Sequence, residues 1–151
     1  MPVPHLLSVL IWLPILGAVA VLAFGSRPNT ARWLSLLVTL ATFAASIPLW
    51  TGYRIAQGGM QFVETLAWIP SLKANYALGA DGISIALIVL TAFTSTLVVI
   101  GSWGPVKQRV AQYMAAMLAL EGFLIGVFAT TDALLFYVFF EAMLIPMFII
   151  I

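Results

Sequence analysis

The 151-residue chain is 64% hydrophobic and only 7% charged, with a formal net charge of +1. Soluble domains carry roughly 25% charged residues, so this composition excludes an ordinary soluble domain and is typical of a helical membrane protein. The small net charge gives no reason to expect nucleic-acid binding. The chain has no cysteine and one histidine, His5, which excludes thiolate-held iron–sulfur clusters and a bis-histidine haem. We therefore expect no redox cofactor in this chain.

Five apolar runs are long enough to cross a membrane, since a ~30 Å hydrocarbon core takes about 20 residues of helix. We expect helices at about 6–24, 32–50, 82–103, 113–130 and 133–151. The first run lacks a preceding Lys or Arg and is too long for a cleaved signal peptide, so we expect an uncleaved helix. The longer outside loop, 51–81, contains Trp68 and Tyr76 and predicts an interfacial segment with a short β-hairpin. The predicted fold class is all-α, a polytopic transmembrane helix bundle that forms a single domain over 1–151.

The basic residues predict the orientation of this bundle. The first and third connections lie on one side of the membrane and hold only cations: Arg27, Arg32, Lys107 and Arg109. The opposite side holds two cations and three acids: Arg54, Lys73, Glu64, Asp81 and Asp132. The positive-inside rule then places the first and third connections in the cytoplasm and the N-terminus outside.

Two glutamates, Glu121 and Glu141, lie in the middle of apolar runs. Glu141 follows Asp132 by nine residues, which places it ~13–15 Å deep, near the membrane midplane. Glu121 precedes Thr131 by ten residues and lies at about the same depth on the preceding antiparallel helix. Whether the two carboxylates face each other depends on the rotation of the helices, which the sequence does not determine.

A charged carboxylate at a helix centre costs roughly 2.5–3.5 kcal/mol on insertion scales. Burial favours the neutral form, so Glu141 and Glu121 are candidates to hold and release a proton near neutral pH. We therefore assign proton transfer to Glu141 and a possible proton relay to Glu121. The alternative is a protonated glutamate that hydrogen-bonds a neighbouring helix and only stabilises the bundle.

Pro146 strengthens the hypothesis for Glu141. A proline within a helix leaves the carbonyl at i−4 without its hydrogen bond, and here that carbonyl belongs to Ala142, beside Glu141. A free carbonyl next to a carboxylate is a place where water can enter. The alternative is an ordinary kink, because membrane helices tolerate proline.

Several smaller patterns predict packing and capping. Gly122 and Gly126 form a GxxxG pattern that permits close helix approach. Asp81 and Asp132 are predicted to cap the third and fifth helices. Four hydroxyl side chains share one face of the third helix, where they line a water chain or serve only packing: Ser84, Thr91, Ser95 and Ser102.

The stretch DALLFYVFFEAMLIPMFIII, 132–151, is similar to the fifth helix of the subunit M (chain 4) family of respiratory NADH:quinone oxidoreductase, complex I. LGADGISIALIVLTAF at 78–93 and LALEGFLIGVFATTD at 118–132 agree with the same family. Phe140 stands where the family more usually has tryptophan. The fifth run also ends at Ile151 with no charge and no following loop, so we expect an N-terminal fragment of a longer protein.

The resemblance implies an antiporter-like fold of about fourteen helices, of which this chain is about the first third. It implies that quinone reduction in another arm of the complex drives proton transfer, and that Glu141 is the central proton-translocating carboxylate. The partner lysine would lie on a later helix. The expected partners are the other membrane subunits and the lipid bilayer, in the bacterial inner (plasma) membrane, with no quinone or redox cofactor bound by this chain. The alternatives are a subunit of a multi-subunit Mrp-type Na+/H+ antiporter and a structural membrane scaffold.

Overall fold

The computed structural model describes residues 6–24, 26–53, 56, 59–72 and 74–150; His5, Arg54, Lys73 and Ile151 lie outside them. Five helices account for most of the chain: α1 Leu6–Phe24, α2 Pro28–Gly52, α3 Gly82–Gly101, α4 Val110–Ala129 and α5 Ala133–Ile150. Each is long and apolar enough to cross a membrane, which confirms the predicted polytopic helix bundle. The second helix begins at Pro28 rather than near Arg32, because a proline in the first turn needs no partner for the N–H that it lacks.

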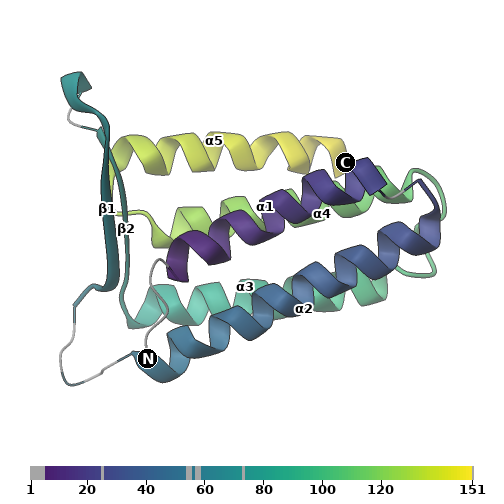
Figure 1. Cartoon of the computed structure of the whole chain (residues 1–151), viewed down its shortest axis with the longest axis horizontal. Coiled ribbons are helices and arrows are strands. Elements are labelled where there is room, and N and C mark those ends of the chain that lie inside the picture. Colours follow the sequence, from purple (N-terminus) through teal and green to yellow (C-terminus); the bar gives the residue numbers. More distant parts are fainter. Residues whose placement is uncertain (1–5, 25, 54–55, 57–58, 73, 151) are drawn as a thin grey trace.

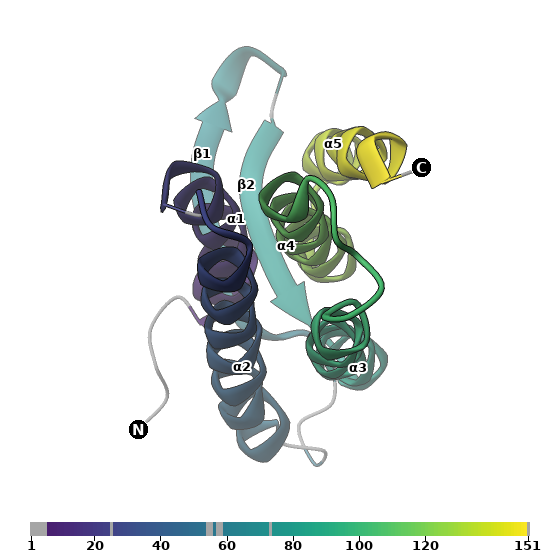
Figure 2. The same ribbon diagram turned by 90° about the vertical axis from the view of Figure 1, so that its right-hand side faces the viewer.

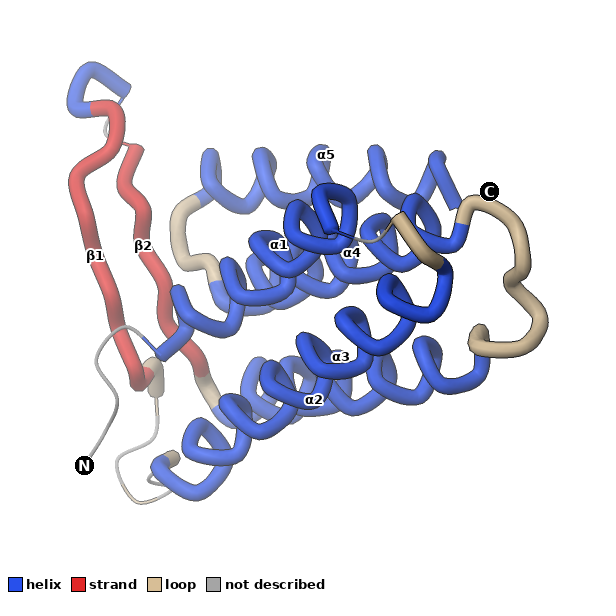
Figure 3. The backbone as a smooth tube through the Cα atoms, turned by 45° about the vertical axis from the view of Figure 1, so that its right-hand side comes forward, coloured by secondary structure: helices blue, strands red, loops and turns tan. Residues whose placement is uncertain are grey.

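A two-stranded antiparallel sheet closes one end of the bundle (Figure 1). Strand β1, Gln61–Ile69, leads through the short 3-10 helix η1, Pro70–Leu72, into β2, Ala74–Ala80. Thr65 pairs with Ala77 in the register of this hairpin. The β-hairpin expected within the long loop is therefore present. It lies across the helix ends where α1, α3 and α5 begin, while the α3–α4 connection lies at the opposite end (Figure 3).

Helix α4 is the centre of the bundle, since it contacts all four other helices. Seen along the helices, α4 lies between α1, α3 and α5 (Figure 2). The core has two parts. The part nearer the hairpin includes Leu10, Ile88 and Ile125, and the part nearer the other end includes Val21 and Met114.

The two glycines of the predicted GxxxG pattern allow close contacts with two different helices. A Cβ atom added at Gly122 would lie 2.7 Å from the backbone oxygen of Ile11 on α1. A Cβ atom added at Gly126 would lie 2.9 Å from ring atoms of Phe139 on α5. The predicted close approach is confirmed, and these contacts determine how α4 is rotated between its neighbours.

Candidate functional site

Three carboxylates at the hairpin end each cap the N-terminus of a helix. Asp81 Oδ1 accepts the backbone N–H of Ser84 at 2.8 Å, at the start of α3. Asp132 Oδ1 accepts the backbone N–H groups of Leu134 at 3.0 Å and Leu135 at 3.1 Å, at the start of α5. Both predicted caps are therefore confirmed, and both satisfy N–H groups that a helix leaves unpaired at its first turn.

Backbone hydrogen bonds lower the pKa of the two aspartates. The backbone N–H of Ser84 is the main reason that the pKa of Asp81 lies below its ordinary value. The backbone N–H of Asn75, 3.0 Å from Asp132 Oδ2, is the main reason that the pKa of Asp132 is lowered. A hydrogen bond to the charged form favours that form, so both side chains remain charged and serve structure.

Glu64 caps α1, which also begins at the hairpin end, and sequence reasoning missed this role. Glu64 lies on β1, yet its Oε2 accepts the backbone N–H of Ser8 at 3.1 Å, in the first turn of α1. Its Oε1 accepts the Ser8 hydroxyl at 2.8 Å. The cap and its helix are 56 residues apart in the chain, so no local pattern could have predicted the contact.

Glu141 lies on the outward face of α5. The buried residues of α5 are Leu135, Phe139, Met143 and Pro146, and they face α4. At about 100° per residue, Glu141 is about 200° around the helix from Phe139 and points away from α4. The side chain is exposed, so the described part of the chain does not cover Glu141, while its place in the middle of a membrane-spanning helix agrees with the expected depth. The physical reason for the exposure is the α4–α5 contact, which rotates the opposite face inward.

A shallow hollow of about 480 Å³ lies along the exposed face of α5. Its walls include Glu141 and Ala142 as well as Leu144, Ile145 and Phe148. The carbonyl of Ala142, which Pro146 cannot bond, therefore lies on the same stretch of α5 as the carboxylate. The other walls of the hollow are apolar, and the entry of water beside Pro146 stays a prediction.

Glu121, in contrast, is buried between α3 and α4, with 1% of its side chain exposed. A cavity of about 280 Å³ that is open on one side lies beside it, lined by Thr91, Thr94 and Ser95 of α3. Ser95 interacts with the carboxyl group, but neither carboxyl oxygen has a hydrogen-bond partner of normal geometry among the described residues. Two members of the predicted hydroxyl face of α3, Thr91 and Ser95, thus line the wall opposite Glu121.

The two glutamates lie at one level but on opposite sides of the α4–α5 pair. Glu121 precedes Ala129 by eight residues and Glu141 follows Ala133 by eight residues, which is about 12 Å of helix in each case. Glu121 faces α3, whereas Glu141 faces away from α4. The described chain does not bring the two carboxyl groups together.

A second hydroxyl row, which sequence reasoning missed, runs along the buried face of α2. Its members are Ser35, Thr39, Thr42 and Ser46, each at most 1% exposed. Each hydroxyl donates to a carbonyl three or four residues earlier in the same helix. The spacing of four, three and four residues was the available signal. Because these donors are already satisfied within α2, the row serves packing.

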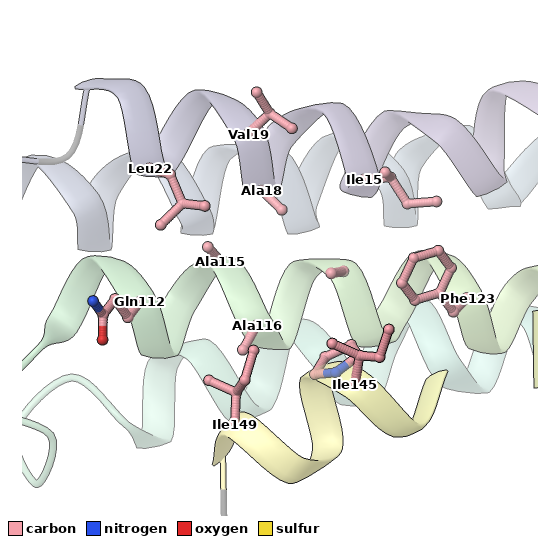
Figure 4. A pocket seen from close by; sticks show the side chains of 12 residues that line it. Ile15, Ala18, Val19, Leu22, Gln112, Ala115, Ala116, Phe123, Ile145 and Ile149 are labelled. Carbon is pink, nitrogen blue, oxygen red and sulfur yellow. The ribbon is translucent and has the colours of Figure 1, made fainter. Parts of the chain in front are cut away.

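An apolar groove of about 640 Å³ lies between α1, α4 and α5. Figure 4 shows Ile15, Ala18 and Phe123 around it, with Gln112 near one end. No carboxylate or other titratable side chain of the described chain lines this groove, so its lining offers no group for proton transfer. Among the described residues, no three His, Cys, Asp or Glu side chains lie close enough together to hold a metal ion.

Comparison with known proteins identifies relatives along nearly the whole chain. The family model for the amino terminus of NADH-ubiquinone oxidoreductase chain 4 matches residues 11–127. NADH-quinone oxidoreductase subunit M of Rhodobacter capsulatus is 47% identical over 152 residues, which cover 97% of this chain and 29% of the relative.

More distant relatives carry similar names. NADH-ubiquinone oxidoreductase chain 4 of Marchantia polymorpha is 41% identical, covering 96% of this chain and 30% of the relative. NAD(P)H-quinone oxidoreductase chain 4 1 of Trichodesmium erythraeum is 38% identical, covering 95% of this chain and 28% of the relative. The chain thus spans less than a third of the length of the curated relatives that it matches.

Proposed function

The chain belongs to the NADH-ubiquinone oxidoreductase chain 4 family, and on that basis we propose that it is the first part of a proton-translocating subunit of NADH:quinone oxidoreductase. The chain is a multi-pass membrane protein. Quinone reduction takes place elsewhere in the complex and drives proton transfer through this subunit. The other membrane subunits and the lipid bilayer are its partners, and the chain itself binds neither quinone nor a redox cofactor.

The position of Glu141 is the observation that carries the proposal. Glu141 is in the middle of a membrane-spanning helix and exposed on the face that the described chain leaves uncovered. A charged carboxylate facing lipid at that depth costs roughly 2.5–3.5 kcal/mol. Acids within membranes nearly always face protein or a water-filled cavity. We therefore propose that a part of the longer protein, beyond this chain, covers the face of α5 that carries Glu141. We also propose that Glu141 transfers protons.

Glu121 is proposed as a relay in the same subunit. It is buried and lies at the depth of Glu141, but it faces α3 rather than α5. A direct transfer between the two carboxyl groups is therefore not part of the proposal. Each would exchange its proton with groups on its own side of the α4–α5 pair.

The distribution of charge supports an orientation with the hairpin outside. The end opposite the hairpin carries Arg27, Arg32, Lys107 and Arg109, while the three capping acids lie at the hairpin end. Arg32 also stabilises the α3–α4 connection, because its Nη2 donates to the carbonyl of Val106 at 2.9 Å. Under the positive-inside rule the cationic end is cytoplasmic. We propose the bacterial inner membrane with the N-terminus outside.

The two alternative functions, a subunit of an Mrp-type Na+/H+ antiporter and a structural membrane scaffold, gain less support. The relatives quoted above are named as subunits or chains of quinone oxidoreductases, and none of these names refers to an antiporter. A structural scaffold would use Glu141 to hydrogen-bond a neighbouring helix, but the carboxylate faces away from α4. Neither alternative is favoured by a specific contact.

The proposal is tested by NADH-driven acidification of inverted membrane vesicles that carry the full-length protein. Glu141→Gln keeps the size and the polar character of the side chain but cannot carry the proton. We expect acidification and coupled NADH oxidation to fall severalfold or more while the complex still assembles. The matched control is Thr51→Val, an exposed position whose hydroxyl bonds its own helix, and it should pump normally. Normal pumping by Glu141→Gln would reject the proposed role.

A further inference from the structure

Glu121 and the cavity beside it carry an inference beyond the Glu141 pathway. We propose that the cavity between α3 and α4 holds a cluster of water molecules that hydrogen-bond the Glu121 carboxyl group and exchange its proton. The physiological use of that proton rests on the proposed function. The hydration itself does not, and it can be measured separately.

The first argument is the missing partner of Glu121. The side chain is 1% exposed, and both of its carboxyl oxygens lack a hydrogen-bond partner of normal geometry among the described residues. Buried polar atoms in folded proteins are nearly always bonded to protein or to ordered water. Ser95 interacts with the carboxyl group but makes no hydrogen bond of normal geometry with it, so the open volume beside Glu121 points to water as the further partner.

The second argument is the size and lining of the cavity. Its volume of about 280 Å³ is several times the ~30 Å³ that one molecule takes up in liquid water. Thr91, Thr94 and Ser95 supply hydroxyl groups on the α3 wall, and Glu121 supplies two oxygens on the α4 wall. Water is stable in a cavity that is both roomy enough and lined by two to four polar partners. The remaining walls are apolar, including Leu120 and Leu124, so Glu121 and the three hydroxyl groups form the polar part of the lining.

The third argument is that the hydroxyl group of Thr91 can still accept a hydrogen bond. Thr91 Oγ1 donates to the carbonyl of Leu87 at 2.8 Å. Its lone pairs therefore remain free to accept a hydrogen bond from water. Water can donate to Thr91 and also accept from, or donate to, the carboxyl group of Glu121. A short chain of such bonds would let Glu121 exchange its proton without any movement of a helix.

The site is independent of Glu141. All residues that line the cavity belong to α3 and α4, while Glu141 lies on the face of α5 turned away from α4. The exchange route for Glu121 therefore runs along the α3 side. Replacing Glu141 should leave it unchanged.

Infrared spectroscopy of the complete complex in native membranes tests the proposal. The difference between wild type and Glu121→Gln identifies the carbonyl band of the protonated Glu121 carboxyl group. On transfer to D2O this band should shift promptly in wild type and equally in Glu141→Gln. Ser95→Leu fills the cavity, and it should slow the shift by about tenfold or more, because the water is excluded.

Two further variants keep the test decisive. Thr91→Val removes a lining hydroxyl at nearly constant size and should also slow exchange, which covers the case in which Ser95→Leu does not assemble. Thr42→Val is the matched control, because it removes a buried hydroxyl of α2 that does not line the cavity. A Glu121 band that does not shift in wild type would overturn the proposal, since the cavity would then be dry. The absence of any such band would also overturn it, since Glu121 would then be ionised.

Discussion

Glu64 on β1 caps α1 through Ser8, with its two carboxylate oxygens 3.1 Å from the Ser8 nitrogen and 2.8 Å from the Ser8 hydroxyl. The Ser8 hydroxyl also lies 2.9 Å from the hydroxyl of Tyr76 on β2, and Trp12 Nε1 donates to the same Tyr76 oxygen at 3.0 Å. Both strands of the hairpin are therefore bonded to α1. The hairpin is also bonded to α5, because Asp132 accepts the backbone N–H of Asn75. It thus holds together the starts of two membrane-spanning helices that do not adjoin in the chain.

Replacing Ser8 should loosen the first turn of α1. Ser8→Ala removes the hydroxyl bonds to Glu64 and Tyr76, and a typical hydrogen bond contributes about 1 kcal/mol to stability. We expect faster amide hydrogen exchange in the first turn of α1 and little change in α3. Mass-spectrometric exchange on the full-length complex measures this, with Thr51→Ala as a control that alters an exposed hydroxyl elsewhere. Equal exchange in Ser8→Ala and wild type would contradict the role of this contact.

Asp132 predicts a specific dependence on pH. Its folded-state pKa lies below the ordinary value of 3.8, mainly because of the hydrogen bond from Asn75. The carboxylate therefore contributes its full stabilisation above pH 3.8 and loses it as the pH falls through the lower folded-state pKa. The amides of Leu134 and Leu135 should stay protected from pH 7 to 5 and lose protection only in stronger acid.

Asp132→Asn is the matched variant for this prediction. It keeps an oxygen that can accept the capping hydrogen bonds but removes the charge that titrates. We expect its exchange, corrected for the intrinsic effect of pH, to show no extra loss of protection in acid. A wild-type loss of protection already between pH 7 and 5 would be inconsistent with a lowered pKa at Asp132.

Gly122→Ala should destabilise the bundle. The added Cβ atom would lie 2.7 Å from the Ile11 carbonyl oxygen, so α1 and α4 would have to separate. Overpacking of this kind typically costs about 1–3 kcal/mol. Gly101→Ala is the control, since no atom lies within 4 Å of its added Cβ. The midpoint of thermal disassembly of the complex should fall for the first variant only, and equal midpoints would show that the contact is not close in the assembled protein.

Local patterns predicted the helices and the caps that are near in sequence. Asp81 and Asp132 bond amides two or three residues ahead, so a short stretch of sequence contains both partners. The five membrane-spanning helices were also predicted from local sequence, because a helix that crosses the lipid needs an apolar run of a minimum length. The cap that Glu64 provides for α1 depends on how the hairpin folds back over the bundle, which no local pattern contains.

Helix rotation was the part of the candidate site that the sequence could not determine. The depths of Glu121 and Glu141 follow from counting residues, but their directions depend on tertiary contacts. The close approach of Gly126 to Phe139 turns the apolar face of α5 toward α4 and leaves Glu141 outside. The roles of both glutamates in proton transfer remain predictions.

The number of protons translocated per NADH oxidised, measured for Glu141→Gln in vesicles, tests the central claim most directly. This ratio does not depend on how much complex assembles. If Glu141 carries protons, the ratio falls in Glu141→Gln and is at least partly retained in Glu141→Asp, which keeps a carboxyl group. A wild-type ratio in Glu141→Gln would contradict the account, because protons would then cross the complex without this carboxylate.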